Sequence, residues 1–266
     1  MDEGYKSKKI RELAANARGQ LIGKYGVAIL ATLIVSSIEI LLTLFSQGNS
    51  ITISTTGYLM SLVITVIIDL LLGILVFGQV NFYLKIARGD ESLALADLFR
   101  GIRGLTDKAI LVQSIFTGFS VLSLIPSVLI HFGVVYVPNE YYYYSFIGVS
   151  ILEFIIMFIS RLYFGASFYI LADHPEWSVP EIFRESIYLM KKKKGRLALT
   201  YLSCIPLFIV SFLACGIGVL WFASFFQTLI ANFYLDLIKE EPWTPNNFNK
   251  PTNSPGNDSP TLDIRL

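Results

Sequence analysis

The chain alternates between long apolar runs and short polar segments. Six of the runs carry few charged residues, and each is near or above the roughly 17 to 25 residues that an α-helix needs to cross the hydrocarbon core of a bilayer. They cover residues 27–45, 58–81, 109–135, 145–171, 197–213 and 219–238. The pattern predicts an all-α, polytopic membrane protein built as a six-transmembrane-helix bundle over residues 27–240.

Three further segments have the apolar spacing of amphipathic helices and precede the first, third and fifth runs. Residues 1–26 form a predicted basic surface helix, and two more are expected over about 92–104 and 178–194. In the last of these, Ser178 and Glu181 make a capping box. The residues predicted to face the bilayer or the bundle are Ile182, Phe183, Ile187 and Met190, with Glu185 turned away from them. We expect these helices to lie on the membrane surface.

One segment carries a resemblance as well as a pattern. Residues 169–196 read YILADHPEWSVPEIFRESIYLMKKKKGR, with Asp173, Pro175, Ser178, Ser186, Met190 and the trailing lysines at characteristic places. This run resembles an uncharacterised family of bacterial integral-membrane proteins, a domain of unknown function, in which Asn is usual at the position of His174. The resemblance implies a six-helix membrane protein, and it supplies no activity and no functional residues.

Basic residues are distributed unevenly between the connections. The segments 46–57, 138–144 and 214–218 contain no Lys or Arg, whereas the alternate connections are rich in both. By the positive-inside rule, both termini are predicted to be cytoplasmic, and the resemblance to bacterial proteins implies that the membrane is the bacterial plasma membrane. The tail at 241–266 is rich in Pro, Asn and Ser and has few apolar residues, so we expect it to be disordered.

The chain also contains an internal similarity. The second, fourth and sixth runs end in Asn81-Phe82-Tyr83, Ser167-Phe168-Tyr169 and Asn232-Phe233-Tyr234. A surface helix followed by two spans, repeated three times, would produce this spacing. The alternative is that these residues are the usual aromatic belt at a membrane boundary.

Four ionisable residues fall within the predicted spans: Glu39, Asp69, Glu153 and Arg161. An Asp or Arg at the bilayer centre costs about 2.5 to 3.5 kcal/mol on insertion scales, so such residues usually face the bundle and mark a site. Counting depth along each helix places Asp69 closest to Arg161 among the carboxylates. We therefore expect an ion pair between Asp69 and Arg161 that joins the second span to the fourth.

Small polar residues at helical spacing extend this charged group along the spans. The predicted polar stripe consists of Thr32, Ser36, Thr43, Ser61, Thr65, Gln113 and Thr117. Such stripes line pathways for solutes or ions, but they also serve as hydrogen-bonding contacts between membrane helices. Both interpretations stay open at this point.

The sequence lacks the motifs by which several classes of enzyme and metal-binding protein are identified. The chain has two histidines, no His-Glu-x-x-His, no Cys-x-x-Cys and no Gly-rich phosphate loop, so we expect no catalytic residue, no metal and no cofactor. With 54% hydrophobic and 15% charged residues, the composition is that of a membrane protein and not of a nucleic-acid-binding one.

The function expected from the sequence is non-enzymatic. The first hypothesis is a membrane protein whose buried polar and charged site binds or conducts a small solute, an ion or a lipid headgroup. The alternative is a structural or partner-binding membrane protein with a role in immunity, scaffolding or envelope stress. The expected partners are the lipid bilayer, anionic lipid headgroups at the cytoplasmic face, and either a second copy of the chain or another membrane protein.

Overall fold

The computed structural model describes residues 8–48, 55–90, 92–131, 139–214 and 217–240, so the tail predicted to be disordered lies outside the described residues. The described part of the chain is helical and contains no strand. Six segments are long and apolar enough to cross a membrane, which confirms the predicted six-span, all-α class. The elements are α1 (Ile10–Leu21), α2 (Tyr25–Gly48), α3 (Thr55–Arg88), η2 (Leu95–Arg103), α4 (Thr106–His131), α5 (Asn139–Phe164), α6 (Ser167–Asp173), α7 (Val179–Met190), α8 (Lys194–Leu213) and α9 (Ile217–Glu240).

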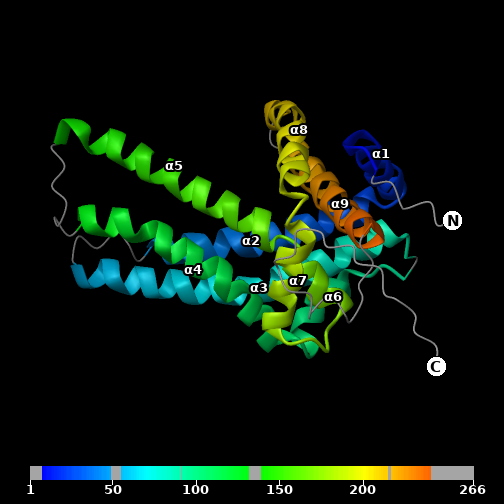
Figure 1. The fold of residues 1–266 in the computed structure, drawn as a ribbon. Coiled ribbons are helices and arrows are strands. Elements are labelled where there is room, and N and C mark those ends of the chain that lie inside the picture. The colour runs from blue at the N-terminus through cyan, green and yellow to red at the C-terminus, as the bar shows by residue number, and fades with distance from the viewer. Residues whose placement is uncertain (1–7, 49–54, 91, 132–138, 215–216, 241–266) are drawn as a thin grey trace, which may run out of the picture.

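The elements form three consecutive units, each with a short helix followed by a hairpin of long helices (Figure 1). The first unit is α1, α2 and α3, the second is η2, α4 and α5 with α6, and the third is α7, α8 and α9. Each short helix packs mainly on the returning helix of another unit: η2 on α3, α7 on α5 and α6, and α1 on α9. The third unit is thereby joined back to the first, and this cyclic order is what a threefold repeat produces.

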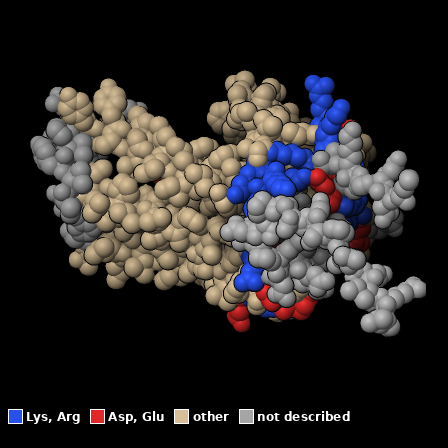
Figure 2. Space-filling model, in the orientation of Figure 1, with Lys and Arg blue, Asp and Glu red and all other residues tan. Residues whose placement is uncertain are grey.

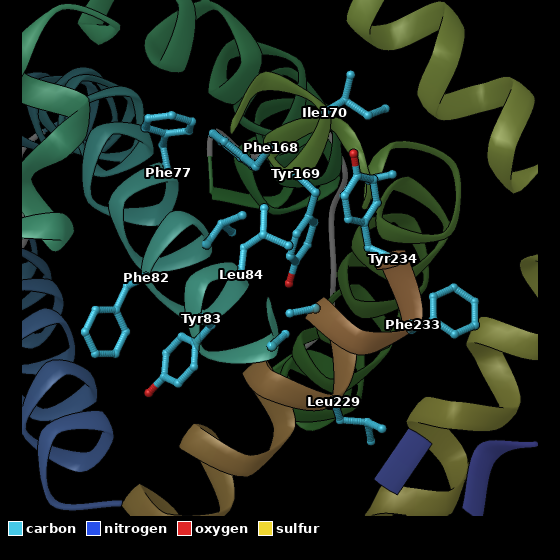
Figure 3. Packing of buried hydrophobic residues seen from close by; sticks show 14 of the residues in the cluster. Phe77, Phe82, Tyr83, Leu84, Phe168, Tyr169, Ile170, Leu229, Phe233 and Tyr234 are labelled. Atoms are coloured by element: carbon cyan, nitrogen blue, oxygen red, sulfur yellow. The ribbon is translucent and has the colours of Figure 1, made fainter. Parts of the chain in front are cut away.

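The three similar tripeptides lie inside this arrangement. All nine of their residues, 81–83, 167–169 and 232–234, are buried. Figure 3 shows the segments of α3, α6 and α9 that carry them approaching one another, with Tyr169 beside Tyr234, whose rings stack at a centroid distance of 5.1 Å. An aromatic belt would face lipid headgroups, so these residues are packing residues of a protein core and not a belt.

Charged side chains gather at one end of the molecule, which we call the basic end (Figure 2). Many large apolar side chains are exposed on the long helices: Phe154 on α5 and Leu202 on α8, for example, are 70% and 60% exposed. Exposed apolar surface on this scale is expected for helices that face lipid. In Figure 1, α2 to α5 extend together from the basic end, whereas the hairpin of α8 and α9 leaves it in a different direction.

The second surface helix differs from the α-helix expected over 92–104, because η2 is a 3-10 helix. Three residues per turn bring Leu95 and Leu98 onto one edge, and Leu98 is buried. The edge approaches α3 so closely that a Cβ added to Gly78 would lie 1.6 Å from the Leu98 carbonyl oxygen. The missing side chain of Gly78 therefore permits this contact.

The third surface helix, α7, begins as predicted. The backbone N–H and the hydroxyl of Ser178 both donate to Glu181, at 2.8 and 2.7 Å, and these hydrogen bonds hold the pKa of the Glu181 carboxyl below its usual range. Ile182, Phe183 and Met190 are buried as expected, while Ile187 is exposed.

The prediction that Glu185 points away from the packed face of α7 is wrong, because this residue is buried. Its charge acts on Tyr234 of α9. Helical spacing located the apolar face of α7 but could not show that the adjacent polar position would also be buried.

Candidate functional site: a carboxylate held between two membrane helices

Asp69 lies near the middle of α3 and is held by two side chains of α4. The Thr117 hydroxyl donates to Asp69 Oδ2 at 2.5 Å, and Gln113 Nε2 donates to Asp69 Oδ1 at 3.3 Å. Gln113 and Thr117 are both buried, whereas Asp69 is half-buried. The carboxylate thus receives one short and one long hydrogen bond from neutral donors.

Glycine and helical spacing bring these side chains together. Asp69 and Gly73 are one turn apart on α3, and Gln113 and Thr117 are one turn apart on α4, so both pairs share a face. A Cβ on Gly73 would lie 2.4 Å from the Cβ of Gln113. Small residues allow membrane helices to approach in this way, and here the approach fixes the register that sets Thr117 opposite Asp69.

The amide oxygen of Gln113 is the unusual atom of this site. Gln113 Oε1 is buried and has no hydrogen-bond partner within the described residues. Because most buried polar atoms have a partner, such an atom points to a missing ligand or water. Asp69, Gln113 and Thr117 together offer a carboxylate and two neutral oxygens, an all-oxygen donor set of the kind that hard cations prefer.

Arg161 does not form the ion pair with Asp69 that the sequence predicted. No ion pair joins these two described residues, and the Arg161 guanidinium instead lies over the ring of Phe116, 4.7 Å from its centroid. The physical reason is that α4 packs against both α3 and α5. It separates the two charges and supplies neutral donors to Asp69.

The four predicted charged residues are therefore not gathered into one site. Arg161 acts electrostatically on Glu39 of α2, although no ion pair between them is formed in the described structure. Glu153 lies on α5, as Arg161 does, but nearer the N-terminus of the helix, and it is half-buried. Among these four charged side chains, Asp69 is the one that is hydrogen-bonded to side chains of the predicted polar stripe within the described residues.

The remaining stripe residues divide into two groups. Thr32 is buried, with its hydroxyl 2.5 Å from that of Tyr83 and 3.0 Å from that of Ser224, so it joins α2, α3 and α9. The hydroxyls of Thr43, Ser61 and Thr65 each donate to a carbonyl of their own helix, and Ser36 is half-buried. Such local bonds satisfy a hydroxyl in an apolar helix without forming a pathway.

Two aspartates at the basic end, the buried Asp236 and the half-buried Asp173, were not proposed as site residues from the sequence. Asp173 accepts two hydrogen bonds from Arg88, at 2.6 and 2.8 Å, and one from the Tyr234 hydroxyl at 2.9 Å. Asp236 accepts from Arg196 and from the backbone N–H of Lys8. Their position in the sequence could have identified them. Asp236 follows the repeated tripeptide by two residues, and Asp173 ends the fourth span.

Fold and surface define a multi-pass membrane protein with a core at its basic end. The chain belongs to the family described as protein of unknown function DUF975, whose family model matches residues 1–241. This confirms the resemblance inferred from residues 169–196. Neither the curated proteins nor the solved structures contain a match to the chain.

Proposed function

We propose that this protein is a non-enzymatic membrane protein that binds a monovalent cation between α3 and α4. The ligands are the Asp69 carboxylate, the Gln113 amide oxygen and the Thr117 hydroxyl oxygen. The observation that carries the proposal is the buried Gln113 Oε1, which has no hydrogen-bond partner in the described structure and lies on the residue that contacts Asp69.

The electrostatics of the site favour a cation. A charged carboxylate in a membrane span is costly, and the long hydrogen bond from Gln113 compensates little of its charge because hydrogen bonds weaken with distance. A bound cation would neutralise Asp69 and give Gln113 Oε1 a partner at once. One carboxylate suits a singly charged ion, whereas dedicated Ca²⁺ sites use six to eight oxygen ligands.

The location of the protein is part of the proposal. The positive-inside rule favours an orientation with the basic end in the cytoplasm, both termini included, and the resemblance to bacterial proteins favours the plasma membrane. Anionic lipid headgroups are then the expected partners of the basic end.

A structural or partner-binding role is the second candidate. It is favoured by the contact among Thr32, Tyr83 and Ser224, in which three hydroxyls hydrogen-bond one another and nearby backbone carbonyls and so join three helices. A protein whose polar residues all serve such contacts would show no response to a specific cation.

The two candidates are separated by thermal unfolding of the purified protein in detergent. The unfolding midpoint is measured in NaCl, KCl and choline chloride at equal ionic strength. A bound ion stabilises the folded state by mass action, so Na⁺ or K⁺ should raise the midpoint relative to choline. Asp69→Asn should abolish this difference, and Glu153→Gln, the matched control in another span, should keep it. Equal midpoints in all three salts would contradict the cation proposal.

A further inference from the structure

A polar cavity lies between α1 and α9 at the basic end of the protein. The two helices pack against each other where the third unit joins the first, and Figure 1 shows them side by side. The cavity has a volume of about 100 Å³, well above the roughly 10 to 15 Å³ that a single water molecule needs. Its polar lining residues are Lys8, Asn16, Gln20, Asn232, Asp236 and Lys239.

Helical spacing sets these side chains on two facing stripes. On α1, Asn16 and Gln20 are one turn apart and share a face. On α9, Asn232, Asp236 and Lys239 are separated by four and three residues and share another. The stripes meet where Asn232 Nδ2 donates to Gln20 Oε1 at 2.6 Å. The two helices therefore enclose a polar space between them.

The negative charges at this cavity are balanced by cations of α8. Asp236, which lines the cavity and is buried, forms an ion pair with Arg196. Glu240, next to Lys239 in the sequence, forms an ion pair with Lys193. Neither carboxylate is therefore left to neutralise a lysine of the lining.

The positive charges of the lining are not balanced in this way. Neither Lys8 nor Lys239 forms a side-chain ion pair with a carboxylate of the described residues. Lys8 is half-buried and Lys239 is exposed, so the cavity can be reached from solvent. Asn16 adds an amide that can donate a hydrogen bond. Two uncompensated cations and an amide donor at one cavity favour an anionic ligand.

We propose that this cavity binds a small anion that carries a phosphate group, held by Lys8 beside α1 and by Lys239 on α9, with Asn16 as a hydrogen-bond donor. Lysine is a common phosphate-binding side chain, and two ammonium groups match a phosphate group, whose charge is about −1.5 to −2 at pH 7. The bound anion would link the first unit to the third.

This site is independent of the proposed cation site. The two share no residue, and Ala87, which also lines the cavity, follows Asp69 by 18 residues on α3. That separation is about 27 Å at 1.5 Å per residue. Either proposal can therefore fail alone.

The test is isothermal titration calorimetry of the full-length protein in an uncharged detergent at pH 8 and constant ionic strength. We expect inorganic phosphate to bind, and singly charged acetate to bind more weakly because the attraction scales with the charge of the ligand. Lys8→Gln with Lys239→Gln should weaken phosphate binding about tenfold per lysine, which corresponds to about 1.4 kcal/mol each. Lys9→Gln with Lys192→Gln, the matched control, removes two exposed lysines that do not line the cavity and should leave the affinity unchanged.

A second variant tests the cavity without altering either lysine. Asn16→Asp keeps the size of the side chain and adds a negative charge to the lining, so it should abolish phosphate binding. Parent affinity in Asn16→Asp would overturn the proposal. So would no phosphate binding by the parent, equal binding of acetate and phosphate, or an equal loss in the lysine pair and its control.

Competition identifies the source of the phosphate group. Displacement of inorganic phosphate by phosphatidylglycerol would assign the site to a lipid headgroup at the membrane surface. Displacement by glycerol phosphate but not by phosphatidylglycerol would assign it to a soluble phosphate ester, and displacement by neither would assign it to inorganic phosphate itself.

Discussion

The hydroxyl of Thr117 lies 2.5 Å from the carboxylate of Asp69 and joins α4 to α3 within the apolar part of the protein. This hydrogen bond is the shortest that Asp69 receives from the described residues. It shows that neutral groups, and not a cationic side chain, hold the central carboxylate.

Thr117→Val should therefore destabilise the protein. The change keeps the shape of the side chain and removes the donor, and hydrogen bonds to charged groups contribute about 1.5 to 3 kcal/mol. We expect a loss of this size in the free energy of unfolding in detergent. Thr65→Val is the matched control, because Thr65 is an exposed residue whose hydroxyl donates to the Ser61 carbonyl of its own helix. An equal effect of both changes would show that the hydrogen bond to Asp69 contributes no more to the free energy of unfolding than a local bond within one helix.

Gly78→Ala tests the contact between η2 and α3. The new methyl group would collide with the Leu98 backbone carbonyl, and overpacking of this kind costs about 1 to 3 kcal/mol or more. Gly118→Ala on α4 is the control, since nothing lies within 4 Å of its added Cβ and alanine favours a helix by up to about 1 kcal/mol. Folded yield and unfolding midpoint should fall for the first variant only. A neutral Gly78→Ala would mean that η2 does not pack this closely.

The sequence was sufficient to predict the spans but not the partners within them. Length and hydropathy are properties of the linear sequence, so the six helices can be predicted by finding apolar runs long enough to cross a bilayer. The pairing of Asp69 with Arg161 was argued from depth alone, and depth does not say which helix lies between two charges. Gln113 and Thr117 were recognised as polar stripe residues, yet their register against Asp69 depends on Gly73, whose role is visible only when the helices are packed.

The core at the basic end was only half predictable for a related reason. The repeated tripeptides were visible in the sequence, but a boundary aromatic residue looks the same whether it faces lipid or protein. Only the packing of α1, η2 and α7 on the returning helices shows that these residues are covered.

The capping box of α7 gives a pH-dependent prediction. The two hydrogen bonds from Ser178 lower the pKa of Glu181, so their contribution is present above the unfolded pKa of about 4.3 and is lost as the pH falls through the lower folded value. At pH 7, Ser178→Ala should cost about 1 kcal/mol locally and speed hydrogen exchange at residues 179–183. Glu181→Gln should remove the pH dependence of this protection. Unchanged exchange in Ser178→Ala would contradict the role of the cap.

The orientation in the membrane is tested by labelling single cysteines in intact cells. Because the connections 46–57 and 138–144 contain no Lys or Arg, we expect an impermeant thiol reagent to label cysteines placed at Ser50 and Asn139. A cysteine placed at Lys192 should be labelled only after permeabilisation. Labelling of Lys192→Cys in intact cells would contradict the proposed topology.

The central claim is that Asp69, Gln113 and Thr117 bind a monovalent cation, and equilibrium binding of radioactive Na⁺ and of Rb⁺, as a substitute for K⁺, tests it most directly. The purified protein should bind one ion per chain at saturation, and Glu153→Gln should bind the same amount. Asp69→Asn should bind none, because the carboxylate is the single charged ligand of the proposed site. If the parent binds neither ion, or if Asp69→Asn binds as much as the parent, the proposed site is wrong.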